Sequence, residues 1–118
     1  MKKIYHLASC STCQRILKQW RPSKNVLLQD IKTEKITPNQ LDELAKLAGS
    51  YESLFSRVAL KYRSMGLNTQ KLNEKDYRKL ILEEYTFLKR PVLIVDSGIF
   101  IGNAPKNVAA AEEFLKKR

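Results

Sequence analysis

Two apolar segments flank an amphipathic one within the first thirty-one residues, and this order constrains the fold more than any other feature. Residues 2–7, "KKIYHL", and residues 25–31, "NVLLQDI", have the composition of strands. Residues 13–20 place apolar side chains at helical spacing. A strand–helix–strand unit of this length closes by a right-handed crossover, which makes its two strands parallel. We therefore expect an α/β protein in which residues 25–31 are buried on both faces of the sheet.

The remainder of the sequence predicts a block of helices, then a strand hairpin and a closing helix. "RPVLIVD" has the composition of a buried strand, "SG" that of a tight turn, and "IFIG" that of a fourth strand. Thr37 can cap the first helix of the block and Gly49 can end it. The expected helices are residues 37–49, a segment within 51–66, residues 73–85 and residues 106–117.

These elements combine into one architecture. We expect a single domain over residues 1–118, with a small four-stranded mixed sheet flanked by helices. A helical insertion of about residues 33–86 would separate the second strand from the third.

Composition and charge narrow the possible functions. The chain has 43% hydrophobic residues and only four Gly and four Pro, which is typical of an ordered globular protein. We find no secretory signal and no apolar run of membrane-spanning length, so we expect a cytoplasmic protein with reduced thiols. The net charge of +10 indicates either solvated basic faces or attraction to an anion, such as an oxyanion, glutathione or an acidic protein surface. Direct binding of nucleic acid is not expected, because the sequence has no zinc-finger spacing and no RNA-binding signature.

The two cysteines of the chain, Cys10 and Cys13, lie where the first strand passes into the first helix. Cys10 precedes the helix, where the helix dipole and free backbone N–H groups favour a thiolate. Cys13 begins the apolar stripe, so burial should oppose its ionisation. This arrangement predicts that Cys10 is the attacking thiolate and Cys13 the resolving thiol.

Two other interpretations of the cysteine pair stay open. A structural zinc site needs four ligands, and the chain offers two cysteines and one histidine, so carboxylates or a second subunit would have to complete it and we favour no metal site. Both cysteines could instead be ordinary small apolar residues, since free cysteine is often buried. A Cys-x-x-Cys motif at a strand–helix junction favours redox chemistry over both.

Three further residues are candidates for the same site. His6 precedes Cys10 by four residues and could stabilise its thiolate or pass a proton, or be an ordinary hydrogen-bonded histidine. Pro91 opens a buried strand, and its peptide bond with Arg90 can be cis, which would place backbone groups beside the cysteine sulfur. Arg90 would then bind an oxyanion through its guanidinium, or else lie on the surface beside the strand.

The segments "IYHLASCSTCQRIL", "FLKRPVLIVD" and "IGNAPKNVAAAEEFL" resemble the arsenate reductase/Spx family over nearly the whole chain. This resemblance implies a thioredoxin-like fold with a helical insertion. In the family's glutaredoxin-linked arsenate reductases, a cysteine matching Cys10 attacks the oxyanion and a histidine matching His6 assists it. Three arginines surround the anion. The first matches Arg90, the second falls on Arg57 or Val58 depending on the register, and the third is replaced by Asn103.

Cys13 departs from those single-cysteine enzymes and resembles the Spx branch. There, a Cys-x-x-Cys motif is the redox switch of a regulator that binds the RNA polymerase α subunit. The resemblance implies a thiol–disulfide oxidoreductase that could reduce an oxyanion such as arsenate, with glutathione/glutaredoxin or thioredoxin as reductant and no tightly bound cofactor. The alternative that it implies is a redox-sensing transcription regulator.

Overall fold

A computed structural model describes residues 2–96 and 98–116. The chain divides into two compact units, one built from the residues up to Lys35 together with those from Arg90 onward, the other from residues 36–89. The second unit is the helical insertion. The single domain over residues 1–118 stays a prediction. Ser97 of the predicted "SG" turn and residue 117 of the predicted last helix lie outside the described residues. Within the described ranges, no helix is both long and apolar enough to cross a membrane.

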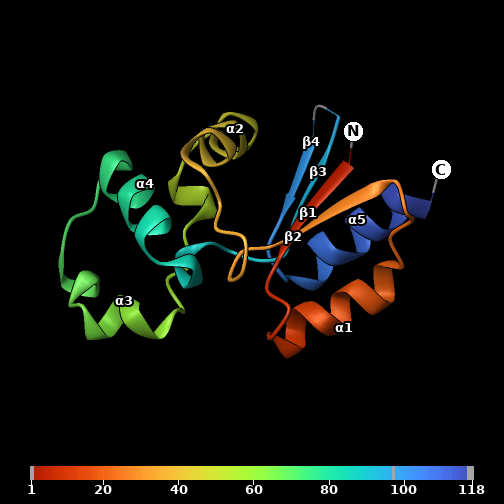
Figure 1. The fold of residues 1–118 in the computed structure, drawn as a ribbon. Helices are drawn as coiled ribbons and strands as arrows, with labels where there is room; N and C mark the ends of the chain where they lie inside the picture. Colours follow the sequence, from red (N-terminus) through yellow and green to blue (C-terminus); the bar gives the residue numbers. More distant parts are fainter. Residues whose placement is uncertain (1, 97, 117–118) are drawn as a thin grey trace. The chain divides into compact units, whose positions relative to one another are not determined.

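The first unit contains a four-stranded mixed sheet, as predicted (Figure 1). Its strands are β1 (Lys2–His6), β2 (Val26–Asp30), β3 (Val92–Val95) and β4 (Gly98–Ile101), in the order β2-β1-β3-β4. β1 is parallel to β2 and antiparallel to β3, which is antiparallel to β4. His6 is the register partner of Asp30, and Tyr5 that of Val92. The C-terminal ends of β1 and β2 and the start of β3 therefore lie side by side, where the strands end.

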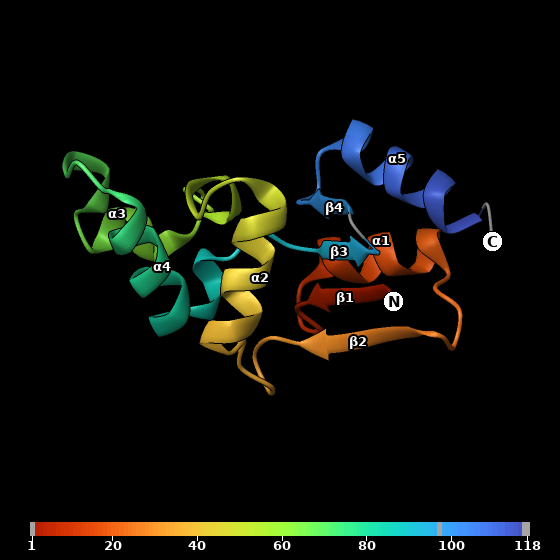
Figure 2. The same ribbon diagram turned by 90° about the horizontal axis from the view of Figure 1, so that it is seen from above.

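The expectation that residues 25–31 are buried on both faces is wrong. Among the described residues, β2 is an edge strand that pairs with β1 alone (Figure 2). Leu27 and Leu28 are each 51% exposed, whereas Val26 and Gln29 are buried. A short apolar run does not distinguish a central strand from an edge strand, because the number of neighbours depends on the whole topology.

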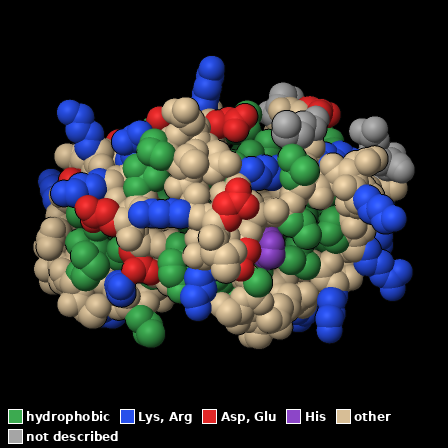
Figure 3. Space-filling model, viewed as in Figure 1, with side chains coloured by type: hydrophobic (Ala, Val, Ile, Leu, Met, Phe, Trp, Pro, Cys, Tyr) green, Lys and Arg blue, Asp and Glu red, His purple; other side chains and the backbone are tan. Residues whose placement is uncertain are grey.

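The excess of positive charge is spread out on the face of the molecule that Figure 3 draws. On the face drawn in Figure 3, the Lys and Arg side chains are dispersed, with Asp and Glu side chains between them. Several cations are paired with carboxylates, as Arg78 is with Asp42 and Lys61 with Glu84. Exposed pairs of this kind add little stability. On the side of the molecule that Figure 3 shows, the dispersed charges therefore favour the interpretation of solvated basic faces.

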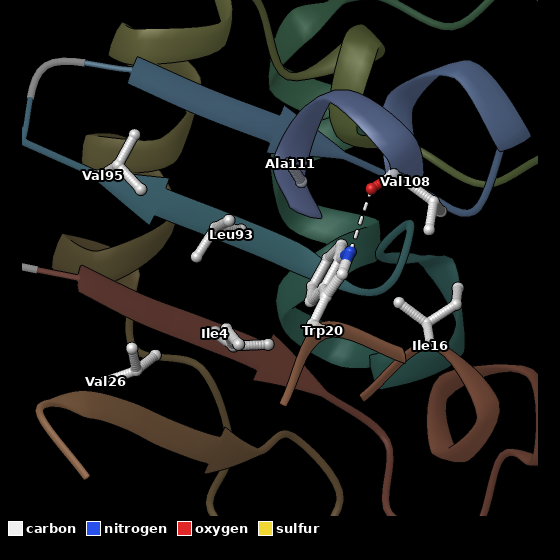
Figure 4. Packing of buried hydrophobic residues seen from close by; sticks show 8 residues of the cluster. All are labelled: Ile4, Ile16, Trp20, Val26, Leu93, Val95, Val108 and Ala111. Atoms are coloured by element: carbon white, nitrogen blue, oxygen red, sulfur yellow. Dashed lines mark hydrogen bonds between the residues drawn. The ribbon is translucent and has the colours of Figure 1, made fainter. Parts of the chain in front are cut away.

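Helices α1 (Ser11–Trp20) and α5 (Pro105–Lys116) pack together on one face of the sheet. The Trp20 indole N–H donates to the Val108 carbonyl at 3.0 Å, which ties the end of α1 to α5 (Figure 4). Eight buried side chains form this core, namely Ile4, Ile16, Trp20, Val26, Leu93, Val95, Val108 and Ala111. This packing fixes the direction of α1, so its first turn lies at the sheet edge where β1 ends.

The insertion holds α2 (Pro38–Ala48), α3 (Leu60–Ser64) and α4 (Glu74–Glu83), with short 3₁₀ turns at Glu52–Leu54, Leu67–Thr69 and Tyr85–Phe87. Thr37 and Asn73 each form a capping box, as the preference of these residues for helix starts predicts. Gly49 ends α2 in the left-handed conformation, also as predicted.

The helix expected within residues 51–66 is confirmed as α3, whose C-cap Met65 directly precedes Gly66, and a 3₁₀ turn lies earlier in the same segment. Phe55 pairs with Leu88 in an isolated antiparallel bridge, and the Ser56 N–H donates to the Phe87 carbonyl at 2.7 Å. Phe55 also packs on Phe87, with ring centroids 5.0 Å apart. These long-range contacts hold the backbone extended at Phe55, so the helix of this segment, α3, begins only after it.

Shortening a side chain in the core of the first unit should lower the free energy of unfolding far more than shortening one on the edge strand β2. Ile16→Ala removes a side chain that is fully buried between α1 and the sheet, and should lower the free energy of unfolding by about 3 kcal/mol. Leu28→Ala removes the same type of apolar bulk from a half-exposed site and should cost less than about 1 kcal/mol. Urea titration followed by the fluorescence of Trp20, the single tryptophan, measures both. Equal losses would contradict the edge position of β2.

Candidate functional site

Cys10 is held at the start of α1 by a tight turn that follows β1. The Cys10 N–H donates to the Leu7 carbonyl at 3.0 Å, and the Cys10 carbonyl accepts the first helical hydrogen bond, from Gln14, at 2.9 Å. Cys10 itself has extended backbone angles and occupies the N-cap position. Cys13 lies one helical turn further on, is fully buried, and like Cys10 is a free thiol. The predicted positions of both cysteines are confirmed.

The surroundings of Cys10 favour its thiolate. Burial works to raise the pKa of Cys10, but the N–H groups of Cys13 and Thr12 and the Cys13 thiol lower it below its ordinary value. The charge of Arg90 acts in the same direction. The two N–H groups face the sulfur without forming a full capping hydrogen bond, so they act mainly as dipoles directed at it.

Cys13 has the opposite environment. Burial raises the pKa of Cys13 to about 11, and the neighbouring Cys10 adds to the rise, while the Leu7 N–H and Arg90 oppose it. At neutral pH Cys13 is therefore a thiol. It lies close enough to Cys10 to donate its S–H to the Cys10 sulfur. The two cysteines thus differ in the way that a nucleophile and a resolving thiol differ.

Arg90 and Pro91 lead into β3 at the same edge of the sheet. Their peptide bond is cis, as predicted. Pro91 is buried, and its carbonyl accepts the Gly102 N–H at 2.9 Å. Arg90 is half-buried, and its charge lowers the pKa of both cysteines, so its guanidinium acts on this site.

His6 ends β1 and is 9% exposed. Within the described part of the chain, its Nδ1 atom has no hydrogen-bond partner. Burial lowers the pKa of His6 below its ordinary value, and the charge of Asp30 opposes this shift only in part. The ring is therefore neutral at physiological pH and can accept a proton. Its role toward Cys10 stays a prediction.

The two remaining candidates lie in different surroundings. Arg57 belongs to the insertion, where its guanidinium donates to Glu52 at 2.7 Å and to the Tyr77 hydroxyl at 2.9 Å. Val58, its alternative in register, is 92% exposed. Asn103 is exposed and follows Gly102, which adopts a positive φ of 86° in the turn before α5. Anion binding by Arg57 or Asn103 stays a prediction.

Two residues that sequence reasoning missed hold the turn before Cys10. Gln14 Nε2 donates to the Ala8 carbonyl at 2.7 Å, and the Ala8 N–H donates to Asp30 Oδ1 at 3.3 Å. Asp30 could have been found, because the ends of parallel strands meet at one edge of a sheet, which places it beside His6. Gln14 lies on the polar face of its helix, where no sequence signal separates it from the neighbouring polar residues.

A separate hollow of about 480 Å³ opens at the other end of the sheet, where β1 and β2 begin. Its lining includes Lys2, Arg21, Val26 and Asp96. The cysteines take no part in it. No group of three or more potential metal ligands occurs among residues 2–96 and 98–116.

Comparison with known proteins agrees with this fold. The model of the ArsC family matches residues 5–111. The chain belongs to the ArsC family. It is 24% identical over 106 residues to the global transcriptional regulator Spx 2 of Bacillus anthracis. The aligned residues cover 86% of this chain and 79% of that protein.

Two solved structures show the same fold. The arsenate reductase of Vibrio cholerae superposes with a TM-score of 0.76 at 16% identity, covering 93% of this chain and 96% of the other. An arsenate reductase-related protein of Brucella melitensis gives 0.70 at 24% identity, covering 92% of each chain. The thioredoxin-like fold with a helical insertion is thereby confirmed.

Limiting alkylation should distinguish the two thiols. Because the pKa of Cys10 is lowered and that of Cys13 is raised to about 11, iodoacetamide at about pH 6.5 should label Cys10 first. Arg90→Gln should move the pH profile of Cys10 labelling upward, since it removes a charge that favours the thiolate, whereas Arg90→Lys should retain most of the effect. Peptide mass spectrometry measures both, and preferential labelling of Cys13 would refute the assignment.

Proposed function

We propose that this ArsC-family protein is a cytoplasmic thiol–disulfide oxidoreductase with Cys10 as nucleophile and Cys13 as resolving thiol. The observation that carries the proposal is the contrast between the two sulfurs. Cys10 is partly exposed with a lowered pKa, and Cys13 is buried with a pKa raised to about 11 and donates to Cys10. Two cysteines with a purely structural role would not require this difference in pKa and burial.

The reaction begins with attack of the Cys10 thiolate on one sulfur of a disulfide R–S–S–R′. The bond from Cys10 to R–S forms, and R′–S⁻ leaves with the bonding electron pair. Cys13 then loses its proton and attacks the Cys10 sulfur, which forms the Cys10–Cys13 disulfide and releases R–S⁻. The substrate gains two electrons, and the protein dithiol loses two. A thiol reductant, either glutathione with glutaredoxin or thioredoxin, returns the protein to the dithiol state.

The order of these two steps follows from the charges at the site. The thiolate of Cys10 contributes to the raised pKa of Cys13, so Cys13 stays protonated while Cys10 is free. Once Cys10 is part of a mixed disulfide its charge is gone, and Cys13 ionises more readily. His6, neutral and with an unpartnered Nδ1, is the candidate proton acceptor at this stage.

An oxyanion such as arsenate is a candidate substrate for the same site. The Cys10 thiolate would displace water from the protonated anion to form a sulfur–arsenic bond, with Arg90 neutralising the anion. A second thiol would then attack the Cys10 sulfur, releasing arsenic(III) with the electron pair and leaving a disulfide. Arg57 is the second candidate cation, while Asn103 offers only a neutral hydrogen bond. We therefore expect this activity to be weak.

A second candidate function is a redox-sensing transcription regulator. The relative that favours it is Spx 2, which is named as a global transcriptional regulator. In that case formation of the Cys10–Cys13 disulfide would change binding to the RNA polymerase α subunit, with no substrate turned over. Pull-down of the purified α subunit by the oxidised but not the reduced protein would support this function over the enzyme.

The disulfide step can be tested by mass measurement. Mild peroxide should lower the mass of the protein by two hydrogens, and Cys13→Ser should abolish this change. In the presence of glutathione, Cys13→Ser should instead accumulate a Cys10–glutathione adduct, because no neighbouring thiol resolves it. Cys10→Ser is the matched control and should form neither product. A disulfide-free wild type after oxidation would remove the basis of the proposal.

Arsenate turnover should respond to the charge at position 103. Asn103→Arg should raise turnover with glutathione and glutaredoxin by about ten-fold, which is the expected worth of one charge-assisted contact to the anion. Asn68→Arg adds the same charge at an exposed position in the insertion and serves as control. Efficient reduction by the wild type, unchanged in Cys13→Ser, would show instead that Cys13 is only a core residue.

A further inference from the structure

We propose that Gln14 and Asp30 form a clamp on Ala8 that positions Cys10 for reaction. Gln14 Nε2 donates to the Ala8 carbonyl at 2.7 Å, and Asp30 Oδ1 accepts the Ala8 N–H at 3.3 Å. One backbone residue is thus held from two elements, the helix that follows it and the strand beside β1. The inference rests on the proposed role of Cys10 as nucleophile, and it makes both residues positioning residues.

The turn that carries Cys10 has little else to hold it. Ala8 and Ser9 are exposed, so no buried side chain anchors this part of the turn. Its own closing hydrogen bond joins the Cys10 N–H to the Leu7 carbonyl. That bond sets the shape of the turn, and the two contacts at Ala8 set its place relative to α1 and β2. The reactivity of Cys10 depends on this placement, because the N–H groups of Thr12 and Cys13 must face its sulfur.

Asp30 is itself fixed in place. Its Oδ1 atom also accepts the Lys32 N–H at 3.2 Å, and its Oδ2 atom accepts the Thr33 hydroxyl at 3.3 Å. These contacts come from the residues that follow β2, and they orient the carboxylate. Asp30 therefore accepts the Ala8 N–H without much further loss of side-chain conformational entropy. Asp30 also neighbours His6 in register, which brings the clamp next to the second candidate of the site.

The helix offers a matched control for Gln14. Gln19 lies in the same helix and also donates a 2.7 Å hydrogen bond from its Nε2 atom, in this case to Glu112 Oε1. Gln14→Met and Gln19→Met therefore each remove one hydrogen bond from an Nε2 donor, with the same change of side chain and no change in the charge of the mutated residue, although Gln19 donates to a carboxylate and Gln14 to a backbone carbonyl. They differ in distance from Cys10, since Gln19 lies near the end of α1 that is remote from the cysteines.

Asp30 needs a different comparison, because its charge also acts on the site. Asp30→Asn and Asp30→Ala both remove the negative charge, but only Asn keeps an oxygen that can accept the Ala8 N–H. The difference between these two variants therefore isolates the positioning contact from the electrostatic effect.

The experiment measures the rate of Cys10 alkylation by iodoacetamide against pH in the full-length protein, with urea titration to show that each variant is folded. We expect Gln14→Met to slow labelling at about pH 6.5 by about three-fold relative to Gln19→Met, which corresponds to an upward shift of the pH profile by about half a unit. We expect Asp30→Ala to be slower than Asp30→Asn by a similar factor. A purely structural role would lower stability in both members of a pair and leave the pH profiles alike.

The outcomes separate the clamp from the proposed function. Preferential labelling of Cys13 in the wild type would refute the nucleophile assignment. Preferential labelling of Cys10 in the wild type, with identical profiles for Gln14→Met and Gln19→Met, would overturn the clamp alone. If Asp30→Ala does not fold, the comparison of Gln14→Met with Gln19→Met still tests the clamp.

Discussion

The first turn of α1 directs the N–H groups of Thr12 and Cys13 at the sulfur of Cys10, and the proposed function depends on that interaction. Burial alone would raise the pKa of Cys10, and the N–H groups of Cys13 and Thr12 reverse the direction. The same helical turn carries Cys13 into the core, where burial raises its pKa to about 11. One local geometry therefore lowers the pKa of one sulfur and raises that of the other, within reach of each other.

That geometry is held from a distance by the core. Ile16 and Trp20 anchor the inner face of α1, and Trp20 ties its last turn to α5 through the Val108 carbonyl. The parallel pairing of β1 with β2 ends with His6 beside Asp30, and Arg90 and Pro91 enter the sheet at the same edge. Residues from three separate parts of the sequence thus meet at Cys10 because the sheet order places their strand ends together.

The sequence was informative wherever the deciding interactions are local. The caps at Thr37 and Asn73 and the asymmetry of the two cysteines follow from residues a few positions apart, and the crossover of the first three elements follows from their order and length within about thirty residues. The full burial expected for residues 25–31 was wrong because a strand's number of neighbours is a property of the whole sheet. The helix expected within 51–66 is present as α3, but the sequence did not place its start, because Phe55 before it is held extended by a partner more than thirty residues away.

The contacts at Ala8 mark the limit of local reasoning at the site itself. Asp30 and Gln14 are common polar residues, and their importance comes only from the backbone atoms that they meet. The departures from the single-cysteine reductases have a related consequence. Asn103 contributes no charge for a tetrahedral anion, whereas Cys13 is already in place as an intramolecular thiol. An intramolecular thiol acts at a high effective concentration, so it competes with external glutathione for any adduct at Cys10. Both features support the proposal that this protein carries out disulfide exchange rather than oxyanion reduction.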